Sequence, residues 1–97
     1  MRLKDRKFEW DANKAVRNLR KHRVSFEEAA TEFNDPRRLR TFDLEHSDDE
    51  DRENVIGFSE RMRLLQVVIY EKENNIIRIV SARRATRQEG LRYFVED

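Results

Sequence analysis

Two segments near the start of the chain space their apolar residues with the period of an amphipathic helix. The first follows Asp11, a good N-cap residue, and its apolar stripe consists of Ala12, Ala15, Val16 and Leu19. The second begins at the capping box Ser25-Phe-Glu-Glu28, and its stripe consists of Phe26, Ala29, Ala30 and Phe33. Pro36 disfavours helix in the residue before it, so the second helix is expected to end at Asn34-Asp35.

After the proline the apolar period changes to two, which is typical of half-buried strands. Four extended segments are predicted, at residues 41–44, 54–59, 64–70 and 76–80. The last two are joined by the polar segment 71–75, a natural hairpin, whereas the acidic stretch 45–51 is predicted to be a loop. A third capping box, Thr86-Arg-Gln-Glu89, begins a short final helix.

This order of elements predicts an α+β fold in a single domain that spans residues 1–97. Strands in an unbroken run between helices favour an antiparallel sheet over βαβ units. We therefore expect two helices, a four-stranded antiparallel sheet and a C-terminal helix. Apolar alternation at Phe8 and Trp10 allows a short extra N-terminal strand.

Composition narrows the class of protein. The 97 residues include 21 Lys and Arg against 20 Asp and Glu, so the net charge is only +1, too small for a uniformly basic nucleic-acid-binding protein. Six Phe, one Trp and two Tyr argue against a disordered acidic tail. Cys is absent, which excludes disulfides, thiolate metal sites and cysteine nucleophiles. Without a signal-peptide pattern or a long apolar run, we expect a cytoplasmic protein that does not bind membranes.

Charge is unevenly distributed along the chain. Residues 1–24 carry nine basic and three acidic side chains, and residues 61–87 carry seven and two, whereas residues 43–53 carry seven acidic side chains and one basic. Such blocks indicate a basic surface for a polyanion or an acidic partner, beside an acidic segment that folds over it. Ordinary solvated faces whose charges happen to cluster explain the same pattern about equally well.

The candidate functional residues are mainly arginines. Arg78, Arg83 and Arg84 lie in or just after the last predicted strand, and a planar guanidinium group suits a phosphate. By the two-residue period, Ser81 and Arg83 share one face of the sheet and Arg78 points to the other. The alternative is a solvated sheet face whose arginines pair with acids such as Glu71.

The two histidines allow two interpretations each. His22 follows Lys21 at the end of the first helix, where a cation favours the macrodipole, so it is either a capping residue or a proton-transfer residue. His46, with Asp43, Asp48 and Glu50 nearby, resembles a divalent metal site, but an acidic loop explains it more simply. Since no metal-ligand spacing or glycine-rich phosphate loop is present, we expect neither metal nor cofactor.

Short motifs in a fixed order resemble one known family over roughly residues 8–93. They include Phe8-Glu-Trp-Asp11, Lys21-His22, Asp35-Pro36, Ile56-Gly57, Arg63, Arg78-Ile-Val-Ser-Ala-Arg83 and Ala85-Thr86. In this order they resemble the BrnT-type toxins, the ribonuclease half of a bacterial type II toxin–antitoxin module. The resemblance implies a RelE-like fold and RNA cleavage that inhibits translation and growth.

The resemblance also implies a partner. A cognate BrnA-like antitoxin with a ribbon-helix-helix domain would neutralise the toxin in a heterotetramer, and operator DNA would be bound only through the antitoxin. RNA would be the substrate. A non-catalytic nucleic-acid-binding or partner-docking module is the alternative function.

Metal-independent cleavage of RNA needs a base for the 2′-hydroxyl proton, cations for the phosphorane and an acid for the 5′-oxygen. We expect Arg52, Arg63 and Arg83 to handle the phosphate, with Ser81 positioning it. Lys21 and His22 are the weaker candidates, for acid/base chemistry, and His46 and Glu50 belong to the same set. The further RNA-binding candidates are Arg17, Arg20, Arg78 and Arg84, and the acidic stretch Asp48–Glu53 is expected to border the active groove.

Overall fold

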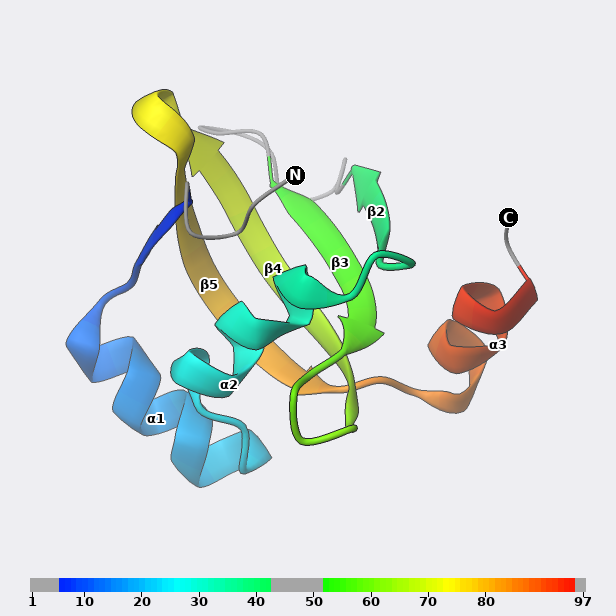
Figure 1. Cartoon of the computed structure of the whole chain (residues 1–97). Helices are drawn as coiled ribbons and strands as arrows, with labels where there is room; N and C mark the ends of the chain where they lie inside the picture. Colours follow the sequence, from blue (N-terminus) through cyan, green and yellow to red (C-terminus); the bar gives the residue numbers. More distant parts are fainter. Residues whose placement is uncertain (1–5, 43–51, 96–97) are drawn as a thin grey trace.

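The computed structural model describes residues 6–42 and 52–95. Within them the chain forms a five-stranded sheet and three α-helices (Figure 1). The strands are β1 (Lys7–Glu9), β2 (Leu39–Phe42), β3 (Glu53–Phe58), β4 (Leu64–Lys72) and β5 (Ile76–Arg84). The helices are α1 (Ala12–His22), α2 (Phe26–Thr31) and α3 (Arg87–Val95), and 3₁₀ turns follow α2 and link β4 to β5.

The sheet has the strand order β1-β5-β4-β3-β2 and is mixed. Strands β2 to β5 pair antiparallel, as expected, and the short N-terminal strand is present as β1. The sheet as a whole is nevertheless not the four-stranded antiparallel sheet predicted, because β1 adds a fifth strand that pairs parallel with β5, with Phe8 beside Ile77. These two residues lie far apart in the sequence, so no hairpin pattern marks their pairing.

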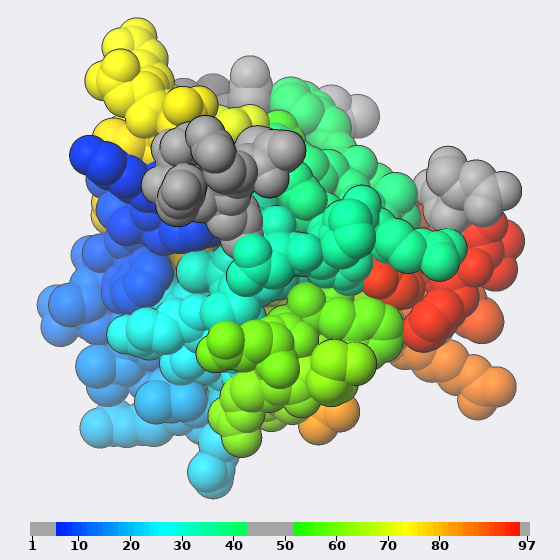
Figure 2. All heavy atoms as spheres, viewed as in Figure 1, coloured from blue at the N-terminus to red at the C-terminus, as the bar shows by residue number. Residues whose placement is uncertain are grey.

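Helices α1 and α2 cover one face of the sheet and enclose the core (Figures 1 and 2). The second predicted stripe is confirmed, since Phe26, Ala29 and Phe33 are buried. Trp10 packs edge-on against Phe26 with ring centroids 5.9 Å apart. Opposite these side chains the sheet contributes Val55, Leu65, Val67, Ile69, Ile77, Ile79 and Ala82.

The first predicted stripe is wrong in its orientation. Val16 is 53% exposed and Leu19 48% exposed, whereas Asn18 between them is only 8% exposed. The amide nitrogen of Asn18 donates to the carbonyl oxygens of Val24 and Ala82 at 2.9 and 2.8 Å, and Asn18 Oδ1 accepts from the Ala82 N–H at 3.1 Å. With its donors and acceptor satisfied, a polar residue takes the inward position, and the apolar pair turns outward.

Helix α3 packs at the other end of the sheet, against β3. Its predicted capping box is confirmed, because Thr86 Oγ1 accepts from the Glu89 N–H at 3.2 Å and Glu89 Oε1 accepts from the Thr86 N–H at 2.9 Å. The ring of Tyr93 lies 5.5 Å from that of Phe58, and its hydroxyl donates to Asp35 at 2.6 Å. These contacts hold α3 beside the sheet rather than over its core.

Gly57 of β3 lies where another segment approaches closely. A Cβ atom at this position would lie 3.0 Å from Glu32 Cγ and 3.1 Å from Arg38 Cβ.

Burial raises the pKa of the fully buried Glu32 carboxyl to about 10. That carboxyl is therefore uncharged at neutral pH.

Replacement of Asn18 by Ala is expected to destabilise the fold by about 3 kcal/mol, because it leaves buried backbone groups of Val24 and Ala82 without partners. Urea denaturation should show a lower midpoint with an unchanged slope. The matched control is Asn13→Ala on the exposed side of α1, which should change stability by less than about 0.5 kcal/mol. Equal stabilities of the two variants would contradict the role given to Asn18.

Candidate active site

An irregularity in β5 decides which face of the sheet its polar side chains occupy. Val68 of β4 pairs with Ser81, but the next residue, Ile69, pairs with Ile79. Val80 therefore has no partner across β4, which is a β-bulge. Side chains alternate with a period of two on either side of a bulge, but the alternation shifts by one position across it.

The shift brings Arg78, Ser81 and Arg83 to the same face. Ile79 before the bulge and Ala82 after it both belong to the core, so the residues next to them in the sequence point away from it. The prediction that Arg78 faces away from Ser81 and Arg83 is therefore wrong. The error arises from the bulge, because the apolar, β-branched sequence of this strand gives no sign that a bulge is present.

We call this surface the outer sheet face. It lies opposite α1 and α2 and consists of three half-buried residues of β5 and their cross-strand partners in β4. The pairs are Arg78 with Tyr70, Ser81 with Val68, and Arg83 with Gln66. Gln66 is 8% exposed, and its Oε1 atom has no hydrogen-bond partner among the described residues.

Arg83 is held by Glu89 of α3. Two guanidinium nitrogens donate to the two carboxylate oxygens at 2.9 and 2.8 Å, and one of them also donates to the Arg84 carbonyl oxygen at 3.1 Å. This bidentate pair lowers the pKa of Glu89 and raises that of Arg83. Pairing with an acid, the alternative to a phosphate-binding role, is thus present, although the acid is Glu89 and not Glu71, and it fixes the direction of the guanidinium group.

Arg78 is also paired with a carboxylate. It donates to Glu9 of β1 at 2.9 Å, and Lys72 of β4 donates to the same oxygen at 2.8 Å. The hydrogen bond from Lys72, followed by that from Arg78, lowers the pKa of Glu9. One carboxylate between two cations leaves this end of the outer sheet face with an excess positive charge.

Arg52 directly precedes β3 and is half-buried. Continued alternation through β3 places it on the same side of the sheet as Asn54, which pairs with Val68. His46, Glu50 and nearly all of the acidic stretch lie outside the described residues.

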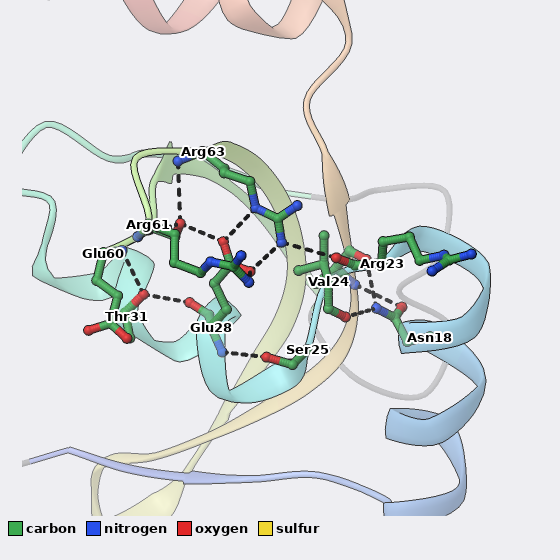
Figure 3. Close-up of polar contacts among 11 residues, drawn as sticks. Asn18, Arg23, Val24, Ser25, Glu28, Thr31, Glu60, Arg61 and Arg63 are labelled. Carbon is green, nitrogen blue, oxygen red and sulfur yellow. Dashed lines mark hydrogen bonds and ion pairs between the residues drawn. The ribbon is translucent and has the colours of Figure 1, made fainter.

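Arg63, in contrast, lies on the helix side of the sheet, where it holds a turn (Figure 3). Its Nε donates to Glu28 Oε2 at 2.9 Å, and a terminal nitrogen donates to Glu28 Oε1 and, at 3.0 Å, to the Arg23 carbonyl oxygen. Ser59 Oγ donates to the same carboxylate at 2.7 Å. Figure 2 shows the turn at residues 59–63 (green) against α2 (cyan). Arg63 therefore joins the β3–β4 turn to the α1–α2 junction.

Glu28 is the important residue of this cluster that the sequence did not reveal. Its capping box is confirmed only in half, because Ser25 Oγ accepts from the Glu28 N–H at 2.9 Å while the carboxylate turns toward Arg63. The side chain is 4% exposed. Its hydrogen bond with Arg63 is the main reason that the pKa of Glu28 is lowered. A Glu three residues after a Ser predicts the cap but gives no sign of the distant arginine.

The remaining candidates lie on the helix side too. Lys21 and His22 end α1, which packs against the core face of β5. Arg84 shares a face with Ala82, two residues earlier in β5, and is exposed. The structure therefore divides the predicted site: the outer sheet face holds Ser81, Arg83 and Arg78, and the helix side holds Lys21, His22, Arg63, Arg84, Arg17 and Arg20.

No three His, Cys, Asp or Glu side chains within residues 6–42 and 52–95 lie close enough to hold a metal ion. In the same ranges no helix is long and apolar enough to cross a membrane.

Comparison with protein families gives a match over residues 10–89, to the family described as the ribonuclease toxin BrnT of type II toxin–antitoxin systems. The chain belongs to the BrnT family. The matched range contains every candidate from Arg17 to Arg84. BrnT proteins are the ribonuclease toxins of their modules, so an antitoxin partner follows from membership.

A solved BrnT structure has a similar fold. The crystal structure of the Brucella abortus ribonuclease toxin BrnT, at 1.1 Å resolution, aligns with a TM-score of 0.62 and 19% sequence identity, over 84% of this chain and 99% of that one. Among curated proteins there is no match. The likeness supports the BrnT resemblance, whereas the RelE-like label is not exact, because this sheet is mixed and has five strands.

Glu28→Gln should destabilise the protein at pH 7 by about 2 kcal/mol, because charged hydrogen bonds to Arg63 are lost. The folded state lowers the pKa of Glu28, so its contribution is full above the ordinary value of 4.5 and is lost as the pH falls through the folded value. The difference in melting temperature between wild type and Glu28→Gln should therefore shrink as the pH falls from 7 to 3. The matched control is Glu27→Gln, an exposed neighbour, and a Glu28→Gln curve parallel to wild type would contradict the assignment.

Proposed function

We propose that this BrnT-family chain is an endoribonuclease that binds the RNA backbone on the outer sheet face. The observation that carries the proposal is the bulge at Val80, which places Arg78, Ser81 and Arg83 on one surface. A positively charged sheet face with hydroxyl and amide groups suits a phosphodiester chain. Family membership supplies the class of reaction.

In the proposed reaction, the 2′-oxygen of one nucleotide attacks the adjacent phosphorus. A P–O bond forms as the bond to the 5′-oxygen breaks, the 2′-hydroxyl proton goes to a base, and the 5′-oxygen receives a proton. Arg83 and Arg52 stabilise the charge that develops on the phosphorane, and the Ser81 hydroxyl positions the phosphate. Arg78 binds the phosphate of a flanking nucleotide.

We add Glu89 to the candidates for proton transfer. It is the carboxylate that contacts Arg83, and it is ionised at neutral pH, although the pairing lowers its pKa and so makes it a weaker base than a free carboxylate. Lys21 and His22 stay weaker candidates, because α1 lies against the opposite face of β5. Together with Arg17, Arg20 and Arg84 they form a basic margin along which RNA approaches.

Arg63 keeps a different role in the proposal. Two of its three guanidinium nitrogens are engaged with Glu28 and Arg23, so it acts as a positioning residue for the β3–β4 turn. Its loss should reduce stability before it reduces the rate of cleavage.

In the cell, metal-independent cleavage of RNA would inhibit translation and growth in the cytoplasm. A ribbon-helix-helix antitoxin of the BrnA type would neutralise the toxin in a heterotetramer and would carry the binding to operator DNA.

Arg83→Ala should reduce the rate of RNA cleavage about a hundredfold or more, which is the loss expected when an enzyme loses one hydrogen-bond donor to its transition state. Its melting temperature should stay near that of wild type, because Arg83 and Glu89 are an accessible pair at the end of the sheet. Cleavage of a defined transcript by the purified protein measures the rate. Arg87→Ala, an exposed arginine nearby, is the control and should cleave normally.

Arg63→Ala should lower the melting temperature more than Arg83→Ala does, because Arg63 holds the β3–β4 turn. Normal cleavage by Arg83→Ala would refute the catalytic assignment. A gel shift without cleavage products, by the wild-type chain, would favour a non-catalytic nucleic-acid-binding module.

Cleavage is expected to persist in EDTA, because the chain has no Cys, and its described residues hold no cluster of metal-binding side chains. The rate on an RNA whose fold does not depend on Mg²⁺ should change by less than about twofold. Loss of activity in EDTA with recovery in Mg²⁺ or Mn²⁺ would contradict the metal-independent mechanism.

A further inference from the structure

The side of α1 that faces away from the sheet carries apolar residues that the fold leaves uncovered. Val16 is 53% exposed and Leu19 is 48% exposed, although both are aliphatic and one helical turn apart. With Arg20 and Arg23 they line an open hollow of about 630 Å³. We call these four residues the α1 surface.

This exposure is built into the fold. Burying Val16 and Leu19 would require α1 to rotate about its axis, and rotation would break the three hydrogen bonds of Asn18 with Val24 and Ala82. Single exposed apolar residues are common on protein surfaces and need no explanation. Here two of them adjoin and share one hollow, which is typical of a surface that another molecule covers.

The charged residues of α1 have one sign. Among the residues of α1 and its C-cap there is no acid, and the cations are Lys14, Arg17, Arg20, Lys21 and Arg23. An aliphatic centre with a basic rim fits a helix with aliphatic residues on one side and carboxylates beside them. RNA would be attracted to the rim, but its phosphates gain nothing from the aliphatic centre.

We propose that the α1 surface docks an acidic, amphipathic helix of the antitoxin, an inference that rests on the toxin role proposed above. Aliphatic side chains of that helix enter the hollow between Val16 and Leu19, and its carboxylates pair with Arg20 and Arg23. The α1 surface and the outer sheet face lie on opposite sides of β5. The apolar centre of the α1 surface, Val16 and Leu19, has no part in the proposed cleavage, so docking and cleavage can be separated by mutation there.

The test uses the full-length chain and, as probe, the purified product of the open reading frame directly downstream of its gene. Leu19→Asp places a charge in the apolar centre and should weaken binding by about 30-fold or more, as for an interface hot spot. Arg20→Glu reverses one rim charge and should weaken binding mainly at low salt. Leu91→Asp on α3, an aliphatic residue of similar exposure, is the matched control and should bind like wild type.

A second readout separates this inference from the proposed function. RNA cleavage by the free Leu19→Asp protein, whose substituted residue has no part in the proposed RNA path, should stay within about twofold of wild type, with unchanged circular dichroism. If wild type does not cleave RNA, the proposed function fails, and the binding measurements still decide the docking surface. Wild-type affinity of Leu19→Asp, or failure of the wild-type chain to bind the probe, overturns the inference. Loss of RNA binding with antitoxin affinity intact would also overturn it and identify the α1 surface as an RNA contact.

Discussion

The side-chain amide of Asn18 connects α1, the segment that leads into α2 and the end of β5. Strand β1 pairs with β5 only as far as Arg78, so the backbone of Ala82 has no strand beside it on that edge. Asn18 supplies the missing donor and acceptor and also binds the Val24 carbonyl oxygen. One residue therefore closes a sheet edge and sets the rotation of a helix. The outward position of Val16 and Leu19 is a direct consequence.

Cations on both sides of the sheet are held by carboxylates that come from other helices or strands. Glu89 holds Arg83, Glu9 holds Arg78, and Glu28 holds Arg63. Such pairs keep a guanidinium group in one direction when no ligand is bound, which reduces the entropy lost on binding. The helix-side pair is buried and serves the fold, whereas the two outer pairs remain accessible to a competing phosphate.

Local patterns predicted most of the fold. Capping boxes located α2 and α3, the two-residue period located the strands, and motif order identified the family. The errors involve contacts between residues far apart in the sequence. Periodicity could not show that Asn18 would meet Ala82, that β1 would join β5 in parallel, or that Val80 would bulge. The division of the predicted site between two faces of the sheet follows from these same long-range contacts.

Glu89 has two roles that cannot be fulfilled independently. The same carboxylate accepts from the Thr86 N–H at the start of α3 and from the Arg83 guanidinium group. Any change that turns Arg83 away from Glu89 would therefore also act on the carboxylate that caps the first turn of α3. The hydrogen-exchange rate of the Thr86 backbone amide would report such a change.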